Sequence, residues 1–424
     1  MKDPLGKYEF RCPVHGFIEV SDWERTIIEQ PAFQRLRRIR QLAWTEYVYP
    51  GALHSRFEHS LGVMHTATLL FESIRSHSEE ILKSELSYDD TGLGRHRQLV
   101  RLAALLHDVG HAPFSHAAEE LFPDQGDGKW KYSHEQYSAA IIRKQFRSAI
   151  EDHKANQNYD FRADDVAALV EGSAGAKQGL FWRDLLDGQM DADKMDYLLR
   201  DSHHLGVQYG NFDLHRLINT IRAIRMGEGS PRLGITKGGL HAAEALVIAR
   251  YFMFTQVYYH KTRVAFDIHL RGALKELLPR GVFPSPRDDE LDQFLQWDDW
   301  RVLGLLADRK GGEHGERLAN RNHFRQVWQT PETPSETDTV ELERRKTALG
   351  NLLAAQESAV KSWYKSGRLH DIPVVDSESR KVSPLSSYSK VVENLKTNNQ
   401  VLLYVKPENV DEAKKIMGEL EIEK

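Results

Sequence analysis

Within ten residues the sequence gathers three imidazoles and one carboxylate, on His107, Asp108, His111 and His116. The run just before them, Leu102–Leu106, is apolar on nearly every face, which predicts a buried helix. Gly110 and Pro113 then break that helix, because glycine ends helices readily and proline cannot continue one. The pattern therefore predicts a rigid core helix that presents a His-Asp pair at its end, with two further histidines on a tight loop.

Imidazole and carboxylate side chains together suit a borderline divalent metal such as Mn, Fe, Zn or Ni. The alternative for a single histidine is a helix cap or a satisfied core residue. Four such polar groups behind a buried helix favour function, because burying each of them is costly. His107 and Asp108 supply only two ligands, so other segments must supply the rest.

His59 is a candidate third ligand near the start of a second predicted helix. Leu61, Met64 and Phe71 continue on one face of that helix, which makes it long and amphipathic. Arg56 precedes His59 by about one turn and can point into the same cleft. Taken alone, an arginine at this position would be read as a surface residue.

A third stretch, residues 190–206, carries an unusual stripe of polar side chains. On a helix, one face would present Asp193, Tyr197, Arg200 and Asp201. A solvated, salt-bridged face is the alternative to a functional one. Further along, Ser133 is a candidate N-cap for a helix that begins at His134.

Bulk properties describe an ordinary globular protein. The chain has 424 residues, 40% hydrophobic and 28% charged, and a net charge of -5. This charge argues against attraction of the whole surface to nucleic acid or membrane. No apolar leader and no run of roughly 20 apolar residues stands out, so we expect no membrane span. The single cysteine, Cys12, fits a reducing compartment, and we expect a cytoplasmic protein.

Periodicity predicts the remaining elements. The segment Phe33–Leu42 places apolar residues at helical spacing with arginines between them, which predicts either a solvated basic face or an anion-binding surface. In chain order we further expect a hairpin over 8–20, helices over 23–28, 163–170, 240–267, 297–306 and 318–328, a strand over 401–405 and a helix over 410–420.

Five motifs together resemble the HD-domain phosphohydrolase superfamily, in its deoxynucleoside triphosphate triphosphohydrolase branch, which includes enzymes carrying a SAM and an HD domain. The resemblance covers about residues 5–330, and we expect no SAM domain before the core. The motifs are Phe33–Leu36, Arg56–Val63, His107–His116, Ser133–Gln136 and Asp193–Asp201.

The resemblance implies a mainly α-helical fold: an all-α HD core with a small N-terminal hairpin and a small α+β C-terminal module. We expect the catalytic core over residues 1–285, a helical extension over 286–330, a linker over 331–345 and the C-terminal module over 346–424. The polar, proline-containing composition around Thr330–Thr337 suggests the linker.

The resemblance also implies one divalent metal ion (Mn, Fe, Mg, Zn or Ni) and cleavage of a dNTP into deoxynucleoside and inorganic triphosphate. The metal ligands carried over are His59, His107, Asp108 and Asp193. A metal in this position lowers the pKa of a bound water and polarises the α-phosphate.

Phosphate, acid and sugar roles follow from the same resemblance. His134 is the candidate general acid, His111 and His116 reach the phosphates, and Glu119 orients His116 or is an exposed carboxylate at a helix start. The phosphate-binding candidates are Arg56, Lys194, Arg250 and Tyr197. The groups expected to exclude a ribose 2′-hydroxyl are Gln41, Leu42, Asp201 and Tyr258, the last of which is otherwise a core tyrosine.

Members of this branch assemble into oligomers through nucleotides bound between subunits, so we expect a homo-oligomer and an activating nucleotide. The matching positions are Glu29, Gln34 and Arg37, with glutamate where the best-known member has aspartate. Two other hypotheses stay open: an HD phosphohydrolase acting on another nucleotide, phosphoester or single-stranded nucleic acid, and a non-catalytic nucleotide sensor.

Overall fold

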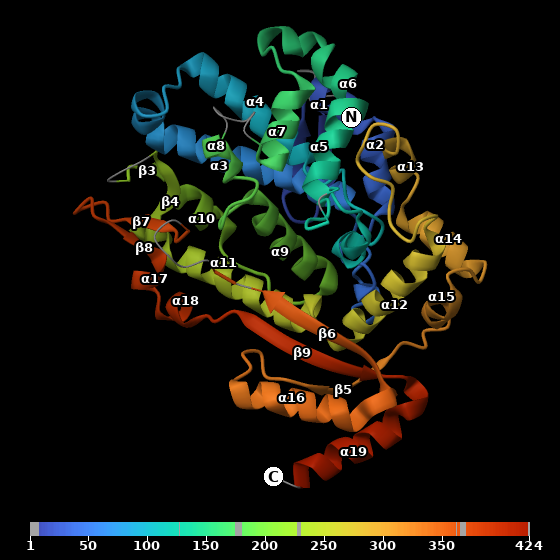
Figure 1. Ribbon diagram of the computed structural model, residues 1–424. Helices are drawn as coiled ribbons and strands as arrows, with labels where there is room; N and C mark the ends of the chain where they lie inside the picture. The colour runs from blue at the N-terminus through green and yellow to red at the C-terminus, as the bar shows by residue number, and fades with distance from the viewer. Residues whose placement is uncertain are drawn as a thin grey trace.

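The computed structural model describes residues 8–126, 128–173, 180–226, 230–361, 363–364 and 370–422. Helices dominate the structure (Figure 1), and the described residues also form three small sheets. The mainly α-helical prediction is therefore confirmed. None of the described helices is both long enough and apolar enough to cross a membrane.

The helices of the first half are α1 Asp22–Ile28, α2 Pro31–Gln34, α3 Arg56–Ser84, α4 Asp90–Leu106, α5 His134–Gln145, α6 Arg147–Glu151, α7 Ala163–Glu171, α8 Leu180–Arg183, α9 Ala192–Leu205 and α10 Leu214–Thr220. Those of the second half are α11 Leu240–Met253, α12 Lys261–Leu277, α13 Leu291–Phe294, α14 Asp299–Ala307, α15 Gly312–Ala319, α16 Glu336–Leu349, α17 Leu385–Tyr388, α18 Lys390–Asn394 and α19 Val410–Ile422. The strands are β1 Tyr8–Cys12, β2 Gly16–Val20, β3 Ile221–Ile224, β4 Arg232–Thr236, β5 Arg325–Gln329, β6 Leu353–Lys361, β7 Pro373–Val375, β8 Val382–Pro384 and β9 Asn398–Val405.

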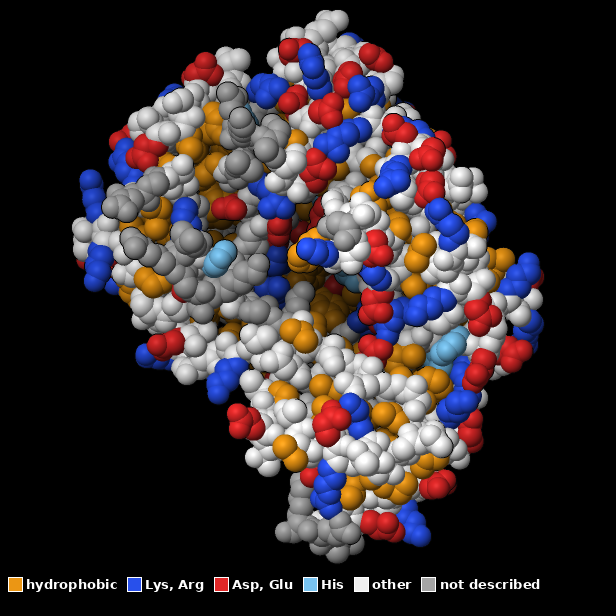
Figure 2. Space-filling model, viewed as in Figure 1, with side chains coloured by type: hydrophobic (Ala, Val, Ile, Leu, Met, Phe, Trp, Pro, Cys, Tyr) orange, Lys and Arg blue, Asp and Glu red, His pale blue; other side chains and the backbone are white. Residues whose placement is uncertain are grey.

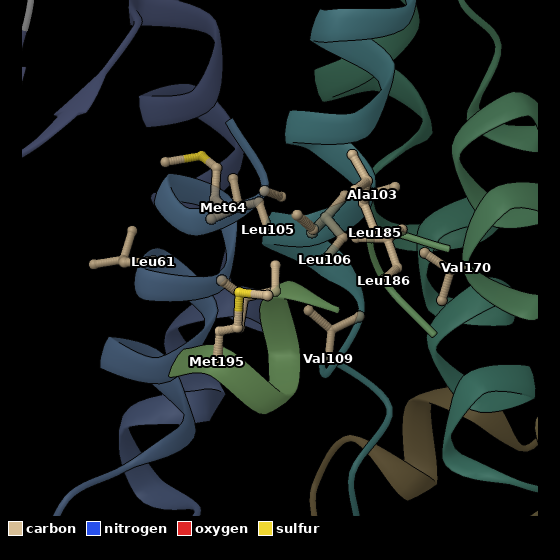
Figure 3. Packing of buried hydrophobic residues seen from close by; sticks show 14 of the residues in the cluster. Leu61, Met64, Ala103, Leu105, Leu106, Val109, Val170, Leu185, Leu186 and Met195 are labelled. Atoms are coloured by element: carbon tan, nitrogen blue, oxygen red, sulfur yellow. The ribbon is translucent and has the colours of Figure 1, made fainter. Parts of the chain in front are cut away.

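The centre of the core is the contact between α3, α4 and α9. Figure 3 shows Leu61 and Met64 of α3, Leu105 of α4 and Met195 of α9 in one buried cluster, and none of these residues is more than 4% exposed. Burying large apolar side chains contributes roughly 1.5–3 kcal/mol each. These contacts fix the three helices that carry the candidate metal ligands.

The end of α4 matches the sequence prediction. The run Leu102–Leu106 is completely buried, and the chain leaves the helix at His107. A Cβ on Gly110 would lie 2.3 Å from the backbone oxygen of His134, so only glycine lets this loop approach α5. The backbone N–H of Gly110 also donates to Ser138 Oγ at 2.9 Å, which holds the loop in place.

Arg35, in the basic segment, is not part of a solvated face. It is 1% exposed, and its guanidinium donates to the backbone oxygens of Trp297 at 3.0 Å and His111 at 2.8 Å. For this arginine, both the solvated and the anion-binding interpretations are wrong. Arg35 instead ties the loop after α4 to the chain that precedes α14.

The C-terminal sheet has the order β5-β9-β6, with α16 and α19 against it (Figure 1). The predicted strand 401–405 and helix 410–420 are confirmed in β9 and α19. The predicted helix 318–328 is wrong, because α15 ends at Ala319 and residues 325–329 form β5, which pairs with β9. The segment 331–345, predicted as a linker, holds most of α16, whose Leu342 and Leu349 are buried.

A second sheet joins the helical body to the C-terminal residues. Its order is β3-β4-β7-β8, and β4 pairs with β7 in parallel, with Ile235 opposite Val374. Residues predicted as a separate C-terminal module therefore complete a sheet that begins near α10. The domain boundaries themselves stay a prediction.

The close approach of α3 and α9 at Gly62 generates a stability prediction. A Cβ on Gly62 would lie 1.9 Å from Asp196 Oδ1 and 2.4 Å from Arg200 Nη2, both completely buried. We expect Gly62→Ala to lower the free energy of unfolding by about 1–3 kcal/mol, as overpacking does. Urea denaturation followed by circular dichroism measures this change.

Gly94→Ala in α4 is the matched control, because no atom lies within 4 Å of the added Cβ. It should raise stability by about 0.5–1 kcal/mol, since glycine is unfavourable inside a helix. An unchanged unfolding midpoint for Gly62→Ala would contradict the tight contact.

Candidate active site

Three helices bring four predicted metal ligands together. His59 lies in the first turn of α3, His107 and Asp108 follow the last turn of α4, and Asp193 lies in the first turn of α9. His59 Nε2 is 3.0 Å from Asp193 Oδ1 and 3.5 Å from Asp108 Oδ2. His107 Nε2 is 3.2 Å from Asp108 Oδ1 and 3.8 Å from Asp193 Oδ1.

These side chains fit a divalent metal. Among the described residues, His59 Nε2 and His107 Nε2 are buried nitrogens without a hydrogen-bond partner. His59, His107 and Asp108 each offer a ligand atom within 4.8 Å of the others. Burial disfavours a charged His59, but Asp193 and Asp196 outweigh burial and raise its pKa to about 10. The site therefore attracts positive charge, and its two nitrogens and two carboxylates form a donor set suited to Mn, Fe or Zn.

Asp196 holds His59 in place, and the sequence analysis missed this role. His59 Nδ1 donates to Asp196 Oδ2 at 2.8 Å, which leaves Nε2 free for a metal. The same carboxylate accepts two bonds from Arg200, at 2.8 and 2.9 Å, and lies 2.6 Å from His15 Nε2. His107 Nδ1 similarly donates to the backbone oxygen of Ala104 at 2.8 Å.

A second cluster, the histidine cluster His111, His116, Glu119 and His134, lies beside the ligands. His134, the first residue of α5, has its Nδ1 2.9 Å from Glu119 Oε1, and its ring stacks on His111 with centroids 4.1 Å apart. His116 Nδ1 is 3.0 Å from the same Glu119 oxygen. Glu119 is half-buried and contacts the other three members, so the interpretation as an isolated exposed carboxylate is wrong.

Electrostatics in this cluster favour a protonated His134. Burial alone would lower the pKa of His134, but the ion pair with Glu119 outweighs it and raises the pKa to about 9. Burial likewise would raise the pKa of Glu119, yet His116 and His134 hold it well below its usual range. His111 is different, because burial and the nearby Arg56 keep its pKa well below the ordinary value.

The two groups open into a cavity of about 530 Å³. Figure 2 shows a hollow near the middle of the molecular surface, with charged side chains around it. The predicted residues that line the cavity are Gln41, Leu42, Arg56, His107, Asp108, His111, His116, His134, Asp193, Lys194, Tyr197, Asp201, Arg250 and Tyr258. His59 and Glu119 do not line the cavity and contact residues that do.

Cationic side chains in the cavity are held by carboxylate, hydroxyl and backbone oxygens of the protein. Arg56 is 3% exposed, and its guanidinium contacts Asp108 Oδ2 at 2.5 Å and Ser115 Oγ at 2.7 Å. Lys194 Nζ lies 2.5 Å from Asp191 Oδ2, and Arg250 donates to the backbone oxygen of Trp363 at 2.9 Å. The positions of these cations are therefore fixed before any ligand arrives.

At Asp201 the cavity is built from buried hydrogen bonds. Tyr258 donates to Asp201 Oδ2 at 2.6 Å, and His54 Nε2 lies 2.7 Å from Asp201 Oδ1. Gln41 Oε1 is buried and has no hydrogen-bond partner among the residues that the structure describes. The sequence analysis missed several lining residues, which lie far apart in the chain: Arg183, Tyr259, Arg263 and Trp363.

The three residues predicted for an activating nucleotide lie outside this cavity. Glu29 and Arg37 are exposed and Gln34 is half-buried. Arg37 Nε donates to Gln34 Oε1 at 2.8 Å, while Glu29 pairs with Arg25 at 2.7 Å. The structure brings them near one surface turn and not to the candidate active site.

Comparison with known families and structures agrees with this geometry. The HD domain model matches residues 56–201, and the HD associated region model matches residues 212–423. A crystal structure of a hypothetical protein from Aquifex aeolicus superimposes with a TM-score of 0.78 at 29% identity, covering 97% of this chain and 100% of that one.

Curated relatives include protein YwfO of Bacillus subtilis, 36% identical over 281 residues, which is 65% of this chain and 58% of that protein. The deoxynucleoside triphosphate triphosphohydrolase SAMHD1 homolog of Dictyostelium discoideum is 33% identical over 269 residues, which is 62% of this chain and 48% of that protein. The matched region spans about half the length of these relatives. On its matched regions and its His, His-Asp and Asp side chains, the chain belongs to the HD-domain family, in the branch that includes the deoxynucleoside triphosphate triphosphohydrolases.

Proposed function

We propose that the protein is a metal-dependent dNTP triphosphohydrolase, which converts a dNTP and water into a deoxynucleoside and inorganic triphosphate. One observation carries the proposal: a single cavity is lined by three of the four metal ligands, by the three histidines of the histidine cluster and by five cationic side chains. The Dictyostelium relative, named as a deoxynucleoside triphosphate triphosphohydrolase SAMHD1 homolog, supports the same activity.

His59, His107, Asp108 and Asp193 would hold the metal, which when bound supplies an acidified water and a Lewis acid for the α-phosphate. Arg56, with its guanidinium fixed by Asp108 and Ser115, would bind phosphate oxygens close to this end. Lys194 and Arg250 would neutralise the remaining triphosphate charge, and Tyr197 would add a hydrogen bond.

His134 would act as the general acid. Water attacks the α-phosphorus, the bond from phosphorus to the 5′ oxygen breaks, and the imidazolium proton of His134 passes to that oxygen. Glu119 keeps His134 protonated and orients its ring. His111 and His116 would contact the phosphates from the loop after α4.

Selection of the sugar would depend on Asp201 and Tyr258, whose short hydrogen bond fixes both side chains in the cavity wall. With Gln41 and Leu42 they would leave no room for a 2′-hydroxyl. An activating nucleotide at Glu29, Gln34 and Arg37 and assembly into a homo-oligomer stay predictions of the family resemblance. A cytoplasmic location stays a prediction from the single cysteine and the composition of the chain.

Product analysis tests the proposal. Purified protein with Mn²⁺ is incubated with each dNTP singly, with the four together, and with GTP, and the products are separated by ion-exchange chromatography. Deoxynucleoside and triphosphate are expected from dNTPs and no product from GTP. Activity only in mixtures would indicate an activating nucleotide. Binding of dNTPs without any product would favour the sensor, and cleavage of another phosphoester alone would favour the broader phosphohydrolase.

Asp196→Asn tests the support of the metal site. Because the amide cannot carry the charge that holds His59 and Arg200, we expect metal affinity to fall about 10–100-fold. Equilibrium dialysis with elemental analysis measures this, and Asp164→Asn, which alters an exposed ion pair with Arg143, should keep the wild-type affinity. Equal affinities in the two variants would contradict the positioning role of Asp196.

His134→Ala tests the general acid. We expect turnover to fall by roughly 10²–10⁴ with little change in substrate binding. In the wild type the acidic form of His134 is present below its raised pKa of about 9, so kcat should decrease as pH rises through that value. Glu119→Gln removes the carboxylate that raises this pKa and should shift the decrease to lower pH. A wild-type rate for His134→Ala would remove it from the mechanism.

A further inference from the structure

The histidine cluster has a geometry that proton transfer alone does not require. Three imidazole nitrogens converge on one carboxylate oxygen: Glu119 Oε1 lies 2.9 Å from His134 Nδ1, 3.0 Å from His116 Nδ1 and 3.4 Å from His111 Nδ1. One histidine would be enough for an acid oriented by a carboxylate. Each of the four side chains offers a ligand atom within 4.8 Å of the other three.

His111 provides a second, independent observation. It is 1% exposed, yet its Nδ1 has no hydrogen-bond partner among the described residues. Its Nδ1 points toward the convergence point at Glu119, and its Nε2 lies 3.2 Å from Asp108 Oδ1. Asp108 faces Nε2, but a buried imidazole whose Nδ1 has no partner is costly, and a bound cation would use the Nδ1 lone pair.

We propose that His111, His116, Glu119 and His134 form a second metal site, separate from the ligands His59, His107, Asp108 and Asp193, and selective for Zn²⁺-like borderline cations. Three imidazoles and one carboxylate match the nitrogen-rich, four-coordinate sets that Zn²⁺ takes, whereas Mg²⁺ prefers oxygen. To admit the ion, the Glu119 oxygen moves from the convergence point to one corner of the tetrahedron. The site is open to solvent, because His116 lines the cavity and its side chain is 62% exposed.

The second site would be inhibitory, and this consequence depends on the proposed function. An ion on Nδ1 of His134 occupies the position of a proton, so the ring stays neutral and its remaining N–H is a far weaker acid than imidazolium. The ion also takes Glu119 away from its orienting role. Zn²⁺ would therefore suppress turnover that Mn²⁺ at the first site supports.

Zn²⁺ stoichiometry tests the site without using activity. The metal-free full chain is dialysed against increasing Zn²⁺, and bound metal is measured by elemental analysis. Two ions per chain are expected, the second binding more weakly because the first already adds positive charge nearby. His116 is exposed, so His116→Ala should not disturb folding. The variant should lower the affinity for the second ion at least about tenfold, because loss of even a partner that only supports a metal ligand lowers metal affinity by that much. His241→Ala, an exposed histidine (side chain 89% exposed) outside the cavity, is the matched control and should bind as the wild type does.

Co²⁺ provides a second readout, because four-coordinate Co²⁺ absorbs visible light strongly. The absorption from the second equivalent should be present in wild type and His241→Ala, and lost in both His116→Ala and Glu119→Gln. One ion per wild-type chain, or a second ion that persists unweakened in both cluster variants, would overturn the proposal. If no dNTP is cleaved but two ions bind as described, the proposed function fails and the second site stands.

Discussion

The carboxylate of Asp196 is the interaction on which the rest of the site depends. It is fully buried and joins three parts of the chain: His59 of α3, Arg200 of its own helix and His15 of the N-terminal hairpin. A buried carboxylate is stable only if it is paired and hydrogen-bonded, and here the two-pronged contact with Arg200 meets that need. Gly62 has no side chain, so the backbone of α3 lies directly against the Asp196 and Arg200 side chains of α9.

Charged side chains elsewhere in the cavity are also held by partners within the protein. Charged side chains in and beside the cavity have oppositely charged or imidazole partners: Arg56 with Asp108, Lys194 with Asp191, and Glu119 with the surrounding imidazoles. Each pair fixes side chains before substrate binds, which lowers the ordering cost of assembling a charged transition state. Arg35 extends this support to the backbone, because its guanidinium donates to the carbonyl oxygens of Val109 and His111 in the loop after α4.

The sequence predicted the features that depend on residues close together in the chain, such as helix caps and the buried face of a helix. The buried run before His107, the N-cap at Ser133 and the amphipathic start of α3 were visible because their signals lie within one or two turns. The contact of His15 with Asp196 joins residues 181 positions apart, and no periodicity reveals such a contact. Residues 325–329 are a strand only because β9 pairs with them, and Arg35 is buried against Trp297 and Phe294, which are about 260 positions away in the chain. Motif resemblance supplied ligand identities that spacing alone left open, while the supporting partners required the structure.

The central claim is that water attacks the α-phosphorus of a dNTP in this cavity. Turnover in water enriched in oxygen-18, followed by mass spectrometry of both products, tests it most directly. The account predicts label in the inorganic triphosphate and none in the deoxynucleoside, because the bond from phosphorus to the 5′ oxygen breaks. Label in orthophosphate, or in the 5′-hydroxyl of the deoxynucleoside, would contradict it.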